Sequence, residues 1–154
     1  MTAGLFYGMR GMPAAGWRRK LGAESMQKDA VMNPGVDTDV VASAFFRRYY
    51  HGLQTDPHTL APFYHDGSLL TFEGENYQGT GAIIGKLQSI TAVTYEVEET
   101  YAQPSMNGGI CVLVKGTLRI NQYPTRFWEF FQIMPTTEDY WILNQIFRSE
   151  TYDY

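Results

Sequence analysis

The sequence predicts an α+β fold in which three helices pack on a strongly curved antiparallel sheet. Up to about residue 89, apolar residues recur with helical spacing, whereas beyond residue 92 apolar and polar residues alternate with a period of two. Between these regions, residues 68–79 have the pattern of a hairpin that leads directly into a helix. Helices followed by a run of antiparallel strands are typical of an α+β domain.

The expected helices are read from caps and apolar spacing. The first covers Asp37–Leu53, with Asp37 or Asp39 as N-cap, and the second is a short helix that opens at Pro57 and runs through Tyr64. The third runs from Thr80, its expected N-cap, to about Ser89 and buries Ile83, Ile84 and Leu87. The first helix is expected to bury an apolar stripe of Val40, Val41, Ala44, Phe45 and Tyr49.

Four strands are expected after residue 92, at 93–101, 110–120, 125–134 and 140–147. The last two carry apolar side chains on both faces, because Phe127, Phe131 and Ile133 alternate with Trp128, Phe130 and Met134, and Ile142 and Ile146 are assigned to one face of the final strand. Three helices cover only one face of the sheet, and soluble monomers avoid large exposed apolar patches. We therefore expect a dimer interface on the other face, formed by Leu113, Trp128, Phe130 and Ile146.

Composition indicates one soluble globular domain with 154 residues and a net charge of −4. The acids lie mainly after residue 31, and an acidic domain argues against nucleic acid as the main ligand. No apolar run approaches the roughly 20 residues that a membrane helix needs. The single cysteine, Cys111, excludes an intrachain disulfide, and its strand context predicts a buried thiol.

Residues 1–36 are rich in Gly, Met and Pro without periodicity, so we expect a disordered extension before a domain at 37–150. The first 23 residues contain four bases and no acid, which is also typical of a mitochondrial presequence. The alternative is an upstream extension of a domain that starts near Met32. The sequence leaves both readings open.

Candidate catalytic residues are few. His51, His58 and His65 are seven residues apart, but glycine and proline breaks separate them, so we expect surface histidines and no metal site. Glu129 shares a strand face with Phe127 and Phe131, and we expect it to be buried in an ion pair with Arg119 or Arg148. No phosphate loop, nucleophile elbow or CxxC motif occurs. We therefore predict a protein that is not an enzyme and needs no cofactor.

Three segments together resemble the nuclear transport factor 2 family. They are the hairpin block at residues 68–79, Phe45–Tyr50 and Asn144–Arg148, and the resemblance covers roughly residues 37–148. It implies a cone-shaped fold and a homodimer that binds the GTPase Ran in its GDP form in the mouth of the cone. It also implies binding to Phe-Gly repeat nucleoporins, import of Ran into the nucleus, and a location in the cytoplasm, the nucleus and the nuclear pore.

The resemblance also implies roles for individual residues. Phe72 and Glu73 match an aromatic–acid pair at the rim of the family's cavity, and Phe147 matches its cavity phenylalanine. Three positions depart from the family: Tyr95 replaces a rim histidine, Asn121 and Gln122 replace two loop acids, and Thr38 replaces a tryptophan that grips nucleoporin repeats. The Ran-binding residues implied by the resemblance are Phe72, Glu73, Leu87, Ile90, Val93, Tyr95, Asn121, Gln122 and Phe147.

Two other functions fit the same fold. One is the light-chain subunit of an mRNA export receptor, which forms a heterodimer with a larger homologous domain and does not need the Ran-binding residues. The other is a small-molecule isomerase or dehydratase, which needs a base inside the cone, and only Glu129 is in a position to supply one.

Overall fold

The computed structural model describes residues 35–150. The extension predicted over residues 1–36 lies outside the described residues, apart from its last two positions. In chain order the elements are α3 (Thr38–Thr55), the 3₁₀ helix η1 (Pro57–Phe63), β1 (Tyr64–Phe72), β2 (Glu75–Gln78), α4 (Thr80–Ser89), β3 (Val93–Pro104), the 3₁₀ turn η2 (Met106–Gly108), β4 (Ile110–Ile120), β5 (Tyr123–Pro135) and β6 (Tyr140–Ser149).

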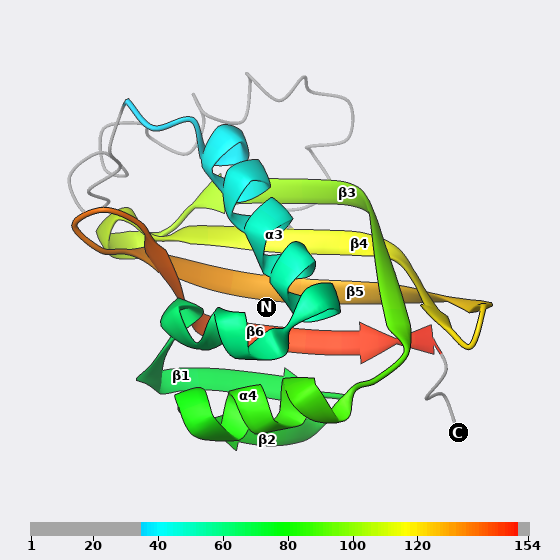
Figure 1. Ribbon diagram of the computed structural model, residues 1–154. Helices are drawn as coiled ribbons and strands as arrows, with labels where there is room; N and C mark the ends of the chain where they lie inside the picture. Colours follow the sequence, from blue (N-terminus) through cyan, green and yellow to red (C-terminus); the bar gives the residue numbers. More distant parts are fainter. Residues whose placement is uncertain (1–34, 151–154) are drawn as a thin grey trace, which may run out of the picture. The chain divides into compact units, whose positions relative to one another are not determined.

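The strands form one six-stranded sheet in the order β2-β1-β6-β5-β4-β3, with α3 crossing one face (Figure 1). The α+β class is confirmed, but the prediction of an antiparallel sheet was wrong, because β1 and β6 pair in parallel, from Leu69–Asn144 to Phe72–Phe147. Hydrophobic alternation shows which residues share a face, but it does not specify the relative direction of two strands that are distant in the chain. The sheet is therefore mixed.

The buried side of α3 is rotated relative to the predicted stripe. Val40 is 64% exposed and Ala44 is also exposed, so both predictions were wrong. Phe46 and Tyr50 are buried instead, because their large rings gain more from removal from water than a valine or an alanine does. The helix begins as expected at Asp37, whose carboxylate accepts hydrogen bonds from the backbone N–H groups of residues 39 and 40 at 3.1 and 3.3 Å.

Two details of the other helices differ from the prediction. The second helix is a 3₁₀ helix that ends at Phe63, and the strand that follows already begins at Tyr64. The N-cap of α4 is Gly79, at φ 81°, and not Thr80. A glycine fits this position because it adopts a positive φ without strain.

The core lies between the helices and the inner face of the sheet, and it is mainly aromatic. Phe46 packs on Phe131 with ring centroids 4.4 Å apart, and Tyr49 meets the same ring edge-on at 5.3 Å. Each such ring removes a large apolar surface from water, and edge-to-face pairs add a specific attraction. The aromatic residues near Phe45–Tyr50 therefore join the first helix to the sheet.

Two irregularities shape the sheet. A bulge in β6 shifts the register between Gln132–Asn144 and Ile133–Ile142, so that Ile142 and Phe147 are both buried and Ile146 is exposed. The prediction that Ile142 and Ile146 share a face was therefore wrong. In β3 a second register shift lies between Val97 and Glu99, near the bend seen in Figure 1.

Gly116 permits the close packing at that bend. A Cβ atom there would collide with the carbonyl oxygen of Glu96 and with the ring of Phe127. Cys111 lies on the opposite face of β4 from the buried Ile110 and Val112. It is half-buried, so the prediction of a buried thiol was wrong. No helix in residues 35–150 is long and apolar enough to cross a membrane.

Candidate binding site at one end of the sheet

Several strand ends meet at one end of the sheet. β1 ends at Phe72, its parallel neighbour β6 ends at Ser149, β3 begins at Val93, and the β4–β5 turn lies at the same end (Figure 1). This end gathers the nine predicted site residues. Two of them, Asn121 and Gln122, form the β4–β5 turn, and we call the other seven the mouth: Phe72, Glu73, Leu87, Ile90, Val93, Tyr95 and Phe147.

Aromatic rings line the mouth in layers. Phe72 is half-buried and stacks on the buried Phe147, with ring centroids 4.5 Å apart and an interplanar angle of 3°. Phe147 in turn stacks on Phe127 with ring centroids 5.8 Å apart, and Tyr95 meets Phe127 edge-on with centroids 5.6 Å apart. The Nζ atom of Lys86 lies 4.9 Å above the ring of Phe72. Phe147 and Phe127 are buried, so only Phe72 and Tyr95 are partly exposed at the mouth, and a cation lies over the ring of Phe72.

The carboxylate of Glu73 is buried at the rim. Its side chain is only 8% exposed, and Oε1 accepts hydrogen bonds from the backbone N–H of Ser149 at 2.7 Å and from its hydroxyl at 2.8 Å. Among residues 35–150, Oε2 has no hydrogen-bond partner, and Nη1 of the half-exposed Arg148 lies 3.9 Å from it. A lysine at position 73 would bury an ammonium group beside Arg148, so that change would disturb the fold.

The β4–β5 turn at the mouth carries no charge. Asn121 and Gln122 are exposed and have φ values of 49° and 73°, as a two-residue hairpin turn with both central residues at positive φ requires. Tyr95, which stands where the family has a rim histidine, is half-buried, and its backbone N–H donates to Oε1 of Gln54 at 3.0 Å.

Glu129 lies beneath the mouth in a buried polar network. Its Oε2 accepts from the hydroxyl of Tyr50 at 2.7 Å, and its Oε1 accepts from Nε2 of Gln145 at 2.6 Å. Gln145 also donates to the hydroxyl of Tyr49 at 2.8 Å and accepts from that of Tyr64 at 2.7 Å. The predicted ion pair with Arg119 or Arg148 was wrong, because neutral donors hold the carboxyl group and Arg148 lies near Glu73.

Burial dominates the acid–base properties of this network. It raises the pKa of Glu129 to about 7, and the hydrogen bonds from Tyr50 and Gln145 only partly offset that effect. Burial likewise raises the pKa of Tyr50 and Tyr95 above the usual tyrosine value, and the nearby Glu129 adds to both shifts. Glu129 is 2% exposed, and both of its oxygens accept hydrogen bonds from neighbouring side chains.

The three histidines do not form a metal site. All three are exposed, and the ring of His65 stacks on that of Trp141 with centroids 4.3 Å apart. Within residues 35–150, no three His, Cys, Asp or Glu side chains gather as a metal-binding group.

The outward face of the sheet carries the residues predicted for a dimer interface. Leu113 pairs across the strands with Phe130, and Phe130 pairs with Ile146, so these three form one cross-strand row. Leu113 is 41% exposed, Ile146 is 47% exposed, and Trp128 is 36% exposed beside them. These apolar side chains of β4, β5 and β6 thus lie on the face of the sheet that points away from the helices.

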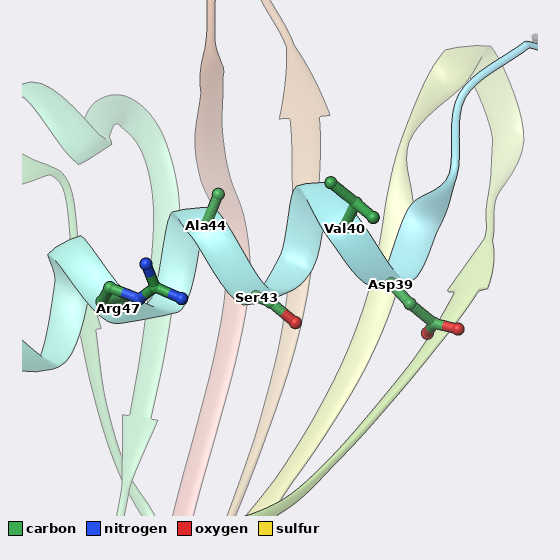
Figure 2. Close-up of a pocket in the computed structure, with 5 residues that line it drawn as sticks. All are labelled: Asp39, Val40, Ser43, Ala44 and Arg47. Carbon is green, nitrogen blue, oxygen red and sulfur yellow. The ribbon is translucent and has the colours of Figure 1, made fainter.

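A shallow open pocket lies on α3. Figure 2 shows the five exposed side chains that line it, which recur on successive turns of the helix: Asp39, Val40, Ser43, Ala44 and Arg47. The pocket contains none of the predicted site residues.

Sequence reasoning missed three residues that organise the site. Ser149 anchors Glu73, Lys86 lies over Phe72, and Gln145 connects Glu129 to two tyrosines. Their roles arise from contacts between distant parts of the chain, which local sequence patterns do not show for Ser149 and Lys86. Only Gln145 had a signal, because a polar residue in an apolar strand usually has a buried partner.

Comparison with known proteins gives a consistent result. The model of the nuclear transport factor 2 (NTF2) domain matches residues 41–149. Nuclear transport factor 2 of Oryza sativa subsp. japonica is 37% identical over 118 residues, which cover 73% of this chain and 97% of the rice protein. The Saccharomyces cerevisiae protein of the same name is 36% identical over 118 residues, covering 73% of this chain and 94% of the yeast protein.

Solved structures agree on the fold. Nuclear transport factor 2 from Cryptosporidium parvum superposes with a TM-score of 0.73 and 32% identity, covering 79% of this chain and 99% of that one. The yeast UBP3-associated protein BRE5 superposes with a TM-score of 0.68 over 75% of this chain and 98% of its own. At 22% identity, BRE5 shows the fold alone.

Proposed function

The chain belongs to the nuclear transport factor 2 family, and on this basis we propose that it is a nucleocytoplasmic carrier that imports Ran into the nucleus. In this proposal the mouth binds Ran-GDP, and the surface of the protein binds Phe-Gly repeat nucleoporins. The carrier performs no chemistry. It moves between cytoplasm and nucleus because weak nucleoporin contacts allow passage through the pore.

The observation that carries the proposal is the stacked pair of Phe72 and Phe147 beside the buried carboxylate of Glu73. Phe147 stacks on the ring of Phe72 and the ammonium of Lys86 lies over it, so an aromatic side chain of Ran would pack on Phe72 in place of the mobile lysine. Leu87, Ile90 and Val93 supply an aliphatic wall next to it. An aromatic anchor in an apolar site is the usual centre of a protein–protein interface.

Glu73 would give this apolar site its polar specificity. Its Oε2 accepts no hydrogen bond within the described part of the chain, whereas Ser149 already satisfies Oε1 and holds the carboxylate in place. The guanidinium of Arg148 covers Oε2 from 3.9 Å but is 52% exposed, so it can move aside for an arginine of Ran. The charge-assisted hydrogen bond would then form with the partner.

We also propose that two copies of the chain associate through the outward face of the sheet. The row of Leu113, Phe130 and Ile146, with Trp128 beside it, supplies the apolar centre that a stable interface needs. The same face could instead meet a larger homologous domain, as in the mRNA export heterodimer. The uncharged Asn121–Gln122 turn favours this second function, because that subunit does not need acids at the mouth.

The mouth is tested by measuring Ran-GDP binding to Glu73→Gln by isothermal titration calorimetry. Glutamine keeps the acceptor for Ser149 but removes the charge, so we expect binding to weaken by on the order of 1 to 3 kcal/mol. Glu75→Gln is the matched control, because Glu75 lies in the same hairpin, is exposed and accepts a hydrogen bond from Tyr77. Equal affinities of Glu73→Gln and wild type would contradict the proposed role of the mouth.

A further inference from the structure

Lys86 covers one of the aromatic rings of the mouth. It lies in the last turn of α4, which packs on β1 and β2 (Figure 1). Its Nζ atom lies 4.9 Å from the centroid of the Phe72 ring on β1 and 5.5 Å from that of the Tyr77 ring on β2. An ammonium group is attracted to the face of an aromatic ring by the negative charge of the π-system. Rings on two neighbouring strands therefore hold this cation.

Both faces of the Phe72 ring are occupied. Phe147 of β6 stacks on one face, with an interplanar angle of 3°. In the sheet β1 lies between β6 and β2, and Lys86 also contacts Tyr77 of β2, so its ammonium lies on the side of Phe72 away from Phe147. Phe147 is 3% exposed and belongs to the core, so the face under Lys86 is the one that a partner can reach.

Weak contacts hold Lys86 over this face. Within residues 35–150, no carboxylate lies within ion-pair distance of its ammonium. Phe72, Tyr77 and Lys86 are all half-buried, so water weakens the attraction between the cation and the rings. A contact of this kind at an exposed site changes an equilibrium by about two- to fivefold. The flexible four-carbon side chain can therefore leave the ring for solvent at a small cost.

We infer that Lys86 is a gate of the mouth, because its ammonium occupies the face of Phe72 that the aromatic side chain of the partner needs. Binding of the partner displaces the ammonium into solvent, so the chain binds more weakly than it would with an open ring. The inference rests on the proposed function and adds regulation to it: any change that removes the positive charge of residue 86 opens the mouth.

Calorimetry with Ran-GDP and the full chain measures the effect of the gate. Lys86→Ala uncovers the ring and favours the helix, so we expect binding about two- to fivefold tighter than wild type. Lys86→Arg keeps a cation over the ring and should bind like wild type. Lys115→Ala is the matched control, because Lys115 is a half-buried lysine of β4 whose ammonium pairs with Glu99 at 3.2 Å. This control should also bind like wild type.

Proton NMR of the free chain tests the position of the ammonium without a partner. Protons above an aromatic ring are shielded by the ring current, so the methylene signals next to Nζ of Lys86 should lie upfield of those of Lys115. Lys86→Arg identifies these signals by their disappearance. Phe72→Leu should move them toward the Lys115 position, and saturation of the wild-type chain with Ran-GDP should displace them from their free position.

Several outcomes would overturn the inference while leaving Ran binding in place. Weaker or unchanged binding of Lys86→Ala is one, and tighter binding of Lys86→Arg or Lys115→Ala is another, because it would indicate a general effect of the substitution or of the charge. Lys86 signals that are unshielded in the free chain, or that stay in place on saturation with Ran-GDP, would also overturn it. Failure of the wild-type chain to bind Ran-GDP would instead overturn the proposed function together with the inference, whatever the signals of the free chain.

Discussion

Replacing Glu129 by glutamine should stabilise the protein at pH 8 and have little effect at pH 5. The carboxyl group is 2% exposed, and the donors to its oxygens, Tyr50 and Gln145, are both neutral. The other ionisable side chains of the network, Tyr49, Tyr64 and Tyr95, are neutral as well, because each has a raised pKa. Ionised Glu129 therefore has no cation among its partners.

The sign follows from the raised pKa. Below pH 4.5 the group is protonated in both folded and unfolded chains, so it adds no pH dependence. Between pH 4.5 and about 7 the unfolded chain has lost the proton but the folded chain keeps it, so stability falls as the pH rises. Above about 7 both forms are ionised and the loss levels off. The difference between the two pKa values corresponds to about 3 kcal/mol in full, of which about 2 to 3 kcal/mol is lost between pH 5 and pH 8.

The assay is urea unfolding of wild type and Glu129→Gln at pH 5, 6, 7 and 8, at one protein concentration. The free energy of unfolding of the variant minus that of wild type should rise by about 2 to 3 kcal/mol from pH 5 to pH 8, because glutamine stays neutral over this range. Its amide oxygen can accept from Gln145, and its amide nitrogen can donate to the hydroxyl of Tyr50, like the protonated carboxyl group. Glu138→Gln, in an exposed loop, is the control and should give a curve parallel to wild type. Parallel curves for Glu129→Gln, or a difference that falls with pH, would refute the reasoning.

Three further substitutions test the packing and the dimer. Ile146→Glu should give monomers in sedimentation experiments, because an unpaired charge at the proposed interface costs several kcal/mol. A wild-type chain that is monomeric at micromolar concentration would remove the basis for the interface. Phe147→Ala should lower the free energy of unfolding by about 3 to 5 kcal/mol in urea titrations, because the ring fills part of the core. It should also weaken Ran-GDP binding, because the ring supports Phe72. Unchanged stability would contradict this. Gly116→Ala should destabilise by about 1 to 3 kcal/mol in thermal unfolding, and a melting temperature equal to wild type would show that β3 does not bend closely over β4.

Local patterns predicted most of the fold. The period-two alternation identified β4, β5 and β6 within a few residues, and turn residues marked the ends of the strands. The patterns failed where the outcome depends on contacts between distant segments. The parallel pairing of β1 with β6 is one example, and the bulge that turns Ile142 inward is another.

The structure brings the residues of the candidate site together, and their role in binding stays a prediction. The resemblance brought Phe72, Glu73 and Phe147 to one end of the sheet, where the structure also places them. It did not indicate that Ser149 would bury the carboxylate of Glu73, nor that Tyr50 and Gln145 would hold Glu129 without a cation. These arrangements follow from the positions of side chains in three dimensions, which alternation along single strands does not contain.

The nucleotide preference of Ran binding is the most direct test of the carrier function. Purified full-length chain should be titrated calorimetrically with Ran loaded with GDP and, separately, with a non-hydrolysable GTP analogue. Binding of Ran-GDP with a clear preference over the GTP form, and its loss on Phe72→Ser, is the result that a carrier for Ran predicts. Equal affinity for both forms, or no binding to either, would contradict it and favour the heterodimeric export subunit.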